Sequence, residues 1–162
     1  MLPLIIFSGC SQHYPILPTV NYVDIHKYEG TWHEIARFEH FFEKGCKNVS
    51  AHYELENDKI KVTNKCTMIT DNKTKVATGI AYAIDATNSK LKVSFFRPFY
   101  GDYYILDLDD NYSYALVGNP NREYLWILSR TKTIDKELKN TLIGKISNLG
   151  FNKEKLLWTI QE

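Results

Sequence analysis

Short runs of alternating apolar and polar residues, separated by turn-forming residues, dominate the chain from Gly30 onward. Alternation with a period of two is typical of strands that bury one face, and Asn, Asp, Gly and Pro between the runs favour tight turns. The expected strands span residues 31–38, 48–55, 59–66, 77–83, 91–96, 103–107, 112–118 and 124–130. Because an open up-and-down sheet would leave two edges unpaired, we expect it to close into an antiparallel barrel whose interior can hold a small ligand.

The periodicity changes after the eighth expected strand. Apolar residues recur at helical spacing from Ile134 to Leu149, Thr133 can cap the start, and Gly150 ends the pattern. This predicts one amphipathic helix packed outside the barrel, followed by a short strand at residues 156–160. The expected fold class is therefore all-β: an eight-stranded antiparallel up-and-down barrel with one C-terminal α-helix and a short final strand.

Length and charge exclude several classes of protein. The 162 residues suit a single domain, and 20 basic against 19 acidic side chains leave a net charge of +1, so we expect no nucleic-acid partner. The five histidines lack the spacing of a zinc motif, and the acidic run ending at Asp110 lacks the glycine and distal Glu of a calcium loop. No metal, cofactor or catalytic residue is expected.

The N-terminus carries a processing motif. The apolar residues 2–7 are followed by Ser8, Gly9 and Cys10, which resembles the lipobox of a bacterial lipoprotein signal peptide, where the cysteine becomes the acylated first residue. We expect residues 1–9 to be the signal peptide, residues 10–21 a tether, and residues 22–162 the folded domain. The alternative is an unstructured tail with an unmodified cysteine.

The other two cysteines lie on one predicted hairpin. Cys46 precedes the second strand and Cys66 ends the third, and an exported protein meets an oxidising compartment, so we expect a disulfide between them. A symmetrical turn at Asn57 would misalign the pair by about three residues, so the pairing needs one or two bulges. The alternative is a free Cys66 thiol in the barrel interior, able to act as a nucleophile.

Three segments together resemble lipocalins. They are GTWHEIARF at Gly30–Phe38, DDNYSYAL at 109–116, and Arg130 at the end of the eighth strand. The further segments RFEH at 37–40, VSFFRPFYG at 93–101 and YLWILSRT at 124–131 are similar to bacterial outer-membrane lipocalins, a group similar to apolipoprotein D. The resemblance covers residues 21–162.

The resemblance implies a function as well as a fold. It favours a non-enzymatic protein that stores or transports fatty acids or lysophospholipids, anchored by lipid to the bacterial outer membrane and facing the periplasm. Two alternatives stay open: a lipocalin-type enzyme using the Cys66 thiol, and a structural envelope protein whose barrel is filled.

Strand alternation assigns most residues of the cavity. Alternation is ambiguous in the seventh strand, where the resemblance favours Ala115 and Val117 as the inward residues. Trp32 is expected to plug one end of the barrel, with the guanidinium of Arg130 covering its indole. The expected ligand-binding residues are Ala36, Phe38, Ala51, Tyr53, Val93, Phe95, Ala115, Val117, Tyr124, Trp126 and Leu128. Phe41 and Phe42 would lie exposed unless they cover the cavity mouth, act as a lid or contact a second copy in a homodimer.

Overall fold

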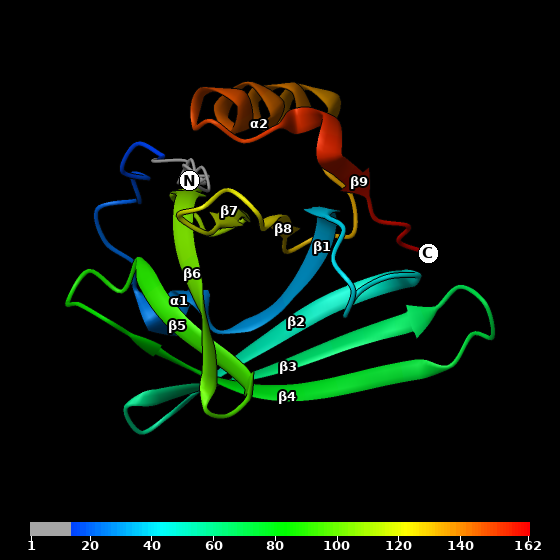
Figure 1. Ribbon diagram of the computed structural model, residues 1–162, viewed down its shortest axis with the longest axis horizontal. Helices are drawn as coiled ribbons and strands as arrows, with labels where there is room; N and C mark the ends of the chain where they lie inside the picture. The colour runs from blue at the N-terminus through cyan, green and yellow to red at the C-terminus, as the bar shows by residue number, and fades with distance from the viewer. Residues whose placement is uncertain (1–13) are drawn as a thin grey trace, which may run out of the picture.

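The computed structural model describes residues 14–162 (Figure 1). The expected signal peptide at residues 1–9 and the expected lipidation site Cys10 lie outside the described residues. The elements are α1 (Ile25–Tyr28), β1 (Gly30–Phe38), β2 (Cys46–Glu56), β3 (Lys59–Met68), β4 (Thr74–Ala83), β5 (Lys90–Phe96), β6 (Phe99–Leu108), β7 (Tyr114–Gly118), β8 (Leu125–Ser129), α2 (Lys136–Asn148), a 3-10 turn (Lys153–Lys155) and β9 (Leu156–Trp158). Every expected strand and the expected helix is present within a few residues of its predicted bounds, whereas the short helix α1 was not predicted.

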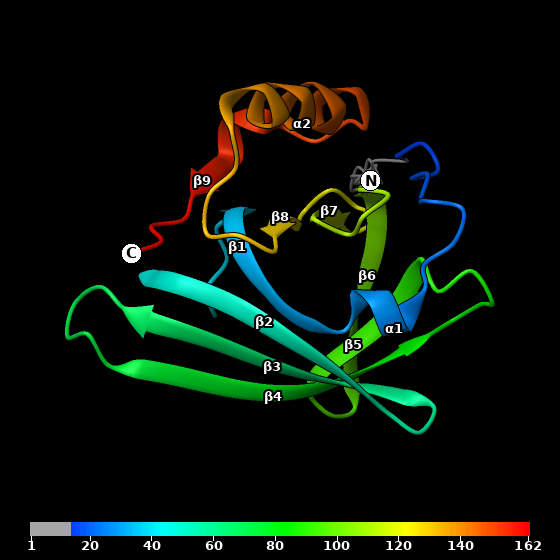
Figure 2. The same ribbon diagram turned by 180° about the vertical axis from the view of Figure 1, so that it is seen from behind.

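The sheet closes into a barrel through its first strand. The strands follow the order β2-β3-β4-β5-β6-β7-β8-β1-β9, all neighbouring pairs are antiparallel, and β1 also pairs with β2. Figure 2 shows β1 running from α1 at one end of the barrel toward the C-terminus at the other. The predicted fold class is confirmed, and β9 adds to the free side of β1 as the expected final strand.

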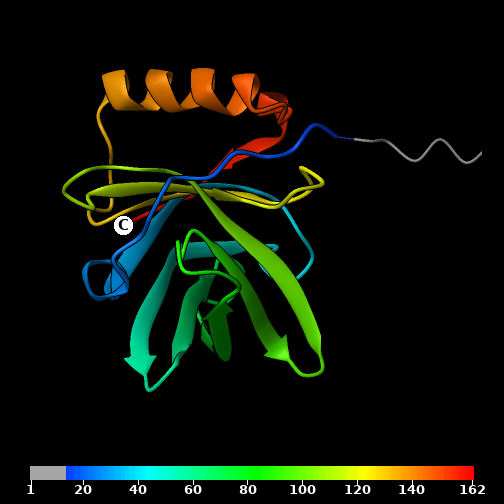
Figure 3. The same ribbon diagram turned by 90° about the vertical axis from the view of Figure 1, so that its left-hand side faces the viewer.

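Helix α2 covers the outside of the barrel. Asp135, rather than the predicted Thr133, caps it, because the Asp135 carboxylate accepts a hydrogen bond from the amide of Leu138 at 2.8 Å. Leu142 and Ile146 are fully buried against the outer faces of β1, β7 and β8. Figure 3 shows the orange helix lying across these strands. No helix within the described part of the chain is both long and apolar enough to cross a membrane.

A bulge in β1 overturns two of the expected inward orientations. The register of β1 against β8 shifts between Glu34 and Ala36, so alternation reverses at this point. Ala36 and Phe38 therefore face outward into the core beneath α2, where the Phe38 ring lies 6.1 Å from that of Phe151. The expectation that Ala36 and Phe38 line the cavity is wrong, and Arg37 faces inward instead.

One end of the barrel is blocked as the sequence argument expects. The guanidinium carbon of Arg130 lies 3.8 Å from the ring centroid of Trp32, which is fully buried. Arg130 also donates to the carbonyl oxygens of Lys27, Thr31 and Tyr112. Gly30 permits this approach, because its φ is +94° and an added Cβ would lie 3.3 Å from Arg130 Nη1.

The end of the expected tether is part of the folded unit. The side chain of Leu17 is buried, and the amide of Val20 donates to the carbonyl of Ile105 in β6 at 3.0 Å. Thr19 additionally contacts Ser89 through their hydroxyl groups. Residues 17–20 are therefore attached to the barrel rather than extended away from it.

Candidate functional site

A cavity of about 280 Å³ occupies the barrel interior above the Trp32 plug. Its wall includes seven of the predicted residues: Ala51, Tyr53, Val93, Phe95, Tyr124, Trp126 and Leu128. The remaining lining residues are Glu34, Phe42, Glu43, Val49, Ser50, Val62, Asn64, Gly101, Asp102, Tyr103 and Asn119. The wall is mostly apolar with a few polar groups, which is the usual character of a site for a small hydrophobic molecule.

Two further predicted residues face inward but do not line the cavity. Ala115 and Val117 are fully buried in the packed core inside the barrel, together with Trp32 and Ile105. The resemblance to lipocalins gave their side correctly, but it does not show where along a strand the packed core ends and the cavity begins. The tyrosine hydroxyls at the deep end are already bonded in a chain in which Tyr103 contacts Tyr28 at 2.8 Å and Tyr53 at 2.9 Å.

The loop at residues 39–45 contributes to the mouth of the cavity. Phe42 lines the cavity, and its ring stacks on His40 with centroids 3.7 Å apart. Phe41 is 87% exposed and does not line the cavity. Of the two phenylalanines expected to cover the mouth, act as a lid or contact a second copy, Phe42 therefore belongs to the cavity wall and Phe41 does not.

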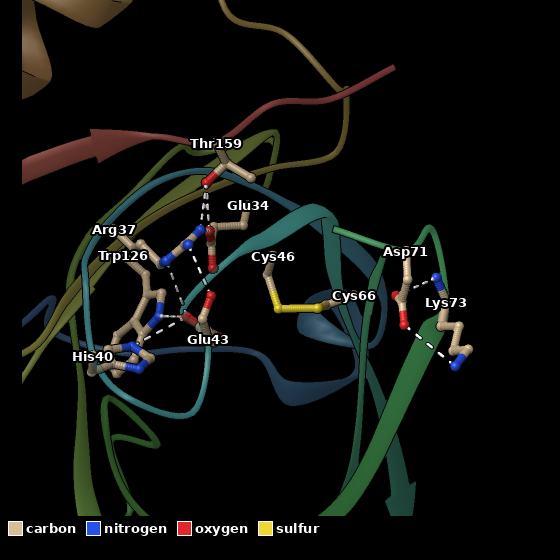
Figure 4. Close-up of a disulfide and its surroundings, with 10 residues drawn as sticks. All are labelled: Glu34, Arg37, His40, Glu43, Cys46, Cys66, Asp71, Lys73, Trp126 and Thr159. Carbon is tan, nitrogen blue, oxygen red and sulfur yellow. Dashed lines mark hydrogen bonds and ion pairs between the residues drawn. A yellow bond between two sulfur atoms is a disulfide. The ribbon is translucent and has the colours of Figure 1, made fainter. Parts of the chain in front are cut away.

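A buried charged cluster beside the cavity was not predicted (Figure 4). Arg37, 1% exposed, donates to the Glu34 carboxylate at 2.7 Å and to the backbone carbonyl of Glu43 at 3.0 Å. Thr159, just after β9, donates to the same Glu34 oxygen. The signal in the sequence was the spacing of Glu34 and Arg37, but only the β1 bulge places both on the inner face.

Glu43 is the second acid of this cluster. Its Oε2 lies 3.1 Å from His40 Nε2, 3.4 Å from Trp126 Nε1 and 3.8 Å from Arg37 Nε. Figure 4 shows these groups converging on one side of the carboxylate. Within the described residues, no side chain donates to the other oxygen, Oε1.

The two carboxylates have opposite pKa shifts. Burial, and then the negative charge of Glu43, raise the pKa of Glu34 to about 7 against the lowering influence of Arg37. Burial alone would also raise the pKa of Glu43, but the hydrogen bonds from His40 and Trp126 and the positive charges nearby lower it overall. Glu43 is therefore the permanently ionised acid of the pair near neutral pH.

The disulfide is present at the mouth of the barrel. Cys46 and Cys66 are bonded with a Cα–Cα distance of 5.5 Å. The hairpin turns at Asn57, and one bulge between Lys47 and Ser50 moves Cys46 opposite Met68 and diagonal to Cys66. One of the predicted bulges is thus sufficient. Because Cys66 is bonded, the alternative of a free luminal thiol acting as a nucleophile is wrong.

The described residues hold no group of three or more His, Cys, Asp or Glu side chains placed to bind a metal ion. The site consists instead of an apolar chamber, an aromatic mouth and an acidic cluster. Such an arrangement can hold a hydrophobic molecule and discriminate the charge of its polar end.

A barrel that is plugged at one end, open at the other and hollow between them defines a small-molecule-binding protein. Residues 23–161 match the family model for a lipocalin-like domain. The chain therefore belongs to the lipocalin family, whose members bind small hydrophobic ligands and are not typically enzymes.

Several relatives are similar over most of their length. The outer membrane lipoprotein Blc of Escherichia coli strain K12 is 43% identical over 157 residues, which cover 94% of this chain and 89% of the relative. The protein of the same description from Vibrio cholerae is 38% identical, covering 98% and 94%. Apolipoprotein D of Macaca fascicularis is 33% identical, covering 90% and 80%.

A solved structure shares the fold. Insecticyanin from the tobacco hornworm Manduca sexta superposes with a TM-score of 0.75 at 21% identity, covering 93% of this chain and 87% of that protein.

Proposed function

We propose that this lipocalin binds a single-chain lipid, either a fatty acid or a lysophospholipid, and stores or transports it in the bacterial cell envelope. The observation that carries the proposal is the largely apolar cavity of about 280 Å³, open at the end where Phe42 and Trp126 lie. This volume is near the lower end of the roughly 300–1,000 Å³ usual for ligand pockets, so it favours one acyl chain over two.

The gain from burying such a chain is large enough for useful affinity. Each methylene removed from water contributes about 0.8 kcal/mol. Ten buried methylenes would contribute about 8 kcal/mol before the entropy losses of binding reduce the total. The cavity thus supports the storage and transport interpretation better than the alternative of a filled structural barrel.

We further propose that Cys10 is acylated and anchors the protein to the outer membrane, facing the periplasm. The support is the Ser8-Gly9-Cys10 motif together with relatives described as outer membrane lipoproteins. Cells fed radiolabelled palmitate should label the wild type and not Cys10→Ser, which should also leave the membrane fraction. A labelled Cys10→Ser variant would refute this assignment.

The binding proposal can be tested by extracting purified protein with organic solvent and identifying lipids by mass spectrometry. A variant that blocks the cavity should lose this binding. Gly101 lines the cavity, and a Cβ added there meets nothing within 4 Å. Gly101→Leu should therefore fill the mouth side of the cavity and reduce binding of a fluorescent fatty acid about tenfold or more. The matched control is Gly144→Leu on α2, where a Cβ also meets nothing but lies outside the barrel. Equal binding by both variants, or no bound lipid, contradicts the proposal.

A further inference from the structure

The charged residues that line the cavity are all acidic. Within the described part of the chain, no Lys or Arg lines the cavity, whereas three acidic residues do. Asp102 is neutralised by Lys92 at 2.6 Å, which leaves Glu34 and Glu43. Arg37 opposes these two, together with His40 when its imidazole is protonated. Arg37 is 1% exposed and already bonded to Glu34 and to the backbone of Glu43, and His40 Nε2 lies 3.1 Å from Glu43 Oε2.

Aromatic rings surround the more exposed side of this acidic cluster. Tyr124 and Trp126 are stacked with centroids 5.9 Å apart, and the Phe42 ring lies 6.4 Å from that of Tyr124. The indole nitrogen of Trp126 lies 3.4 Å from Glu43 Oε2, so rings and carboxylate belong to one wall. Ring faces and a carboxylate together attract an organic cation, because both present negative potential to it.

We propose that this wall of Phe42, Glu43, Tyr124 and Trp126 is a subsite for an ammonium group on a single-chain amphiphile. The inference rests on the proposed lipid-binding function and specifies its head group. An ammonium at the mouth meets Glu43 Oε1, which no side chain of the described residues occupies, while its acyl chain extends toward Val93 and Tyr53.

The same wall disfavours a free fatty-acid carboxylate. Two like charges in a partly desolvated site repel strongly, and the cavity offers no cation to offset them. At the deep end, the hydroxyls of Tyr53 and Tyr103 are already bonded to each other. Among single-chain lipids, the structure therefore favours those with an ammonium group over the fatty acids.

The test compares head groups on one chain length. Delipidated protein is titrated with dodecyltrimethylammonium, dodecanol and dodecanoate below their micelle concentrations, and binding is followed by calorimetry. We expect the ammonium compound to bind about tenfold more tightly than dodecanol, and dodecanoate more weakly than dodecanol. If dodecanoate binds as tightly as dodecanol or more tightly, the inference is overturned without any variant.

Variants of the aromatic and acidic wall test whether it causes the preference for the ammonium compound. Glu43→Gln should reduce ammonium affinity about tenfold, leave dodecanol affinity unchanged and improve dodecanoate. Glu123→Gln, which removes the same charge from an exposed position on the β7–β8 turn, should change none of the three. If Glu43→Gln does not fold, Trp126→Leu replaces it and should weaken the ammonium compound more than dodecanol. An equal loss for all three ligands would overturn the inference.

The ligand series separates failure of the proposed lipid-binding function from failure of the head-group inference. If dodecanol does not bind the wild type, the lipid-binding function itself fails. If dodecanol binds and the ammonium compound has no advantage, only the head-group inference fails. If the ammonium compound does bind more tightly than dodecanol, lauroyl lysophosphatidylcholine is compared with lauroyl lysophosphatidylglycerol to identify the source. A preference for the choline lipid assigns the ammonium to a lysophospholipid. Equal binding shows that the subsite does not accept an ammonium placed beyond a phosphate, which assigns it to a simple amphiphilic amine.

Discussion

Removing the cross-link between Cys46 and Cys66 should lower the stability of the barrel by about 3 kcal/mol. The bond joins residues 20 apart in the sequence, and the chain-entropy cost of a closed loop rises slowly with its length. A loop of about 15 residues corresponds to about 3 kcal/mol and one of about 100 to less than 5, so a loop of this size lies near the lower value.

The loss is measured by urea unfolding followed by tryptophan fluorescence. With a slope of about 1–3 kcal/mol per molar urea, the midpoint should fall by about 1–3 M, and the melting temperature by about 6–12 °C. Reduced wild-type protein is the first sample, because it keeps both buried sulfur atoms beside Val49 and Met68. The double variant Cys46→Ala, Cys66→Ala is the second, and its additional loss reports the packing of the sulfurs.

The outcome that refutes this reasoning is specific. If oxidised and reduced wild type unfold at the same midpoint, the bond does not constrain the unfolded chain as the loop argument requires. If only the double variant is destabilised, the stability comes from sulfur packing and not from the cross-link.

Three further predictions concern the plug, the buried acid and the exposed loop. Arg130→Lys should cost about 2–4 kcal/mol in urea unfolding, because a lysine cannot both cover the Trp32 ring and bond several carbonyls; a loss below 1 kcal/mol would contradict the plug role. The pKa of Glu34 is about 7 in the folded state against a usual value of 4.5, so the folded state binds this proton more tightly than the unfolded state does. The contribution of protonated Glu34 to stability is therefore complete below pH 4.5 and is lost as pH rises through 7, by about 3 kcal/mol in all. Glu34→Gln should flatten this decline between pH 4.5 and 7, and an unchanged slope would assign it to other groups. Phe41→Ser should shift any homodimer to monomer in analytical ultracentrifugation if the exposed Phe41 ring forms the contact, and an unchanged dimer would exclude it.

The parts of the fold that follow a simple period could be predicted from the sequence. The eight strands, helix α2 and the Trp32–Arg130 pair all follow from alternation, helical spacing and the need to close one end. The need for a bulge in the β2–β3 hairpin also followed, because a symmetrical two-residue turn misaligns the two cysteines, but its position between Lys47 and Ser50 was not predicted.

The β1 bulge could not be predicted in the same way. No glycine or proline marks it, and Ile35 and Ala36 are both compatible with either face of a strand. The error in Ala36 and Phe38 and the failure to expect the charged cluster have this one origin. A regular alternation through residue 38 would have sent Arg37 outward, on the opposite face of the strand from Glu34, so no pairing of the two would have been expected.

The bulge explains how one strand serves both cores of the molecule. Before it, β1 directs Trp32 and Glu34 into the barrel; after it, Ala36 and Phe38 pack under α2 while Arg37 faces the interior. Without the shift in register, Ala36 and Phe38 would face the barrel interior and Arg37 would face the core beneath α2, so the helix would lose these apolar contacts with β1. Burying Arg37 has a cost that must be offset by carboxylates, and these same carboxylates give the cavity mouth its negative character. The charge preference proposed for the ligand is in this sense a consequence of how the barrel attaches its helix.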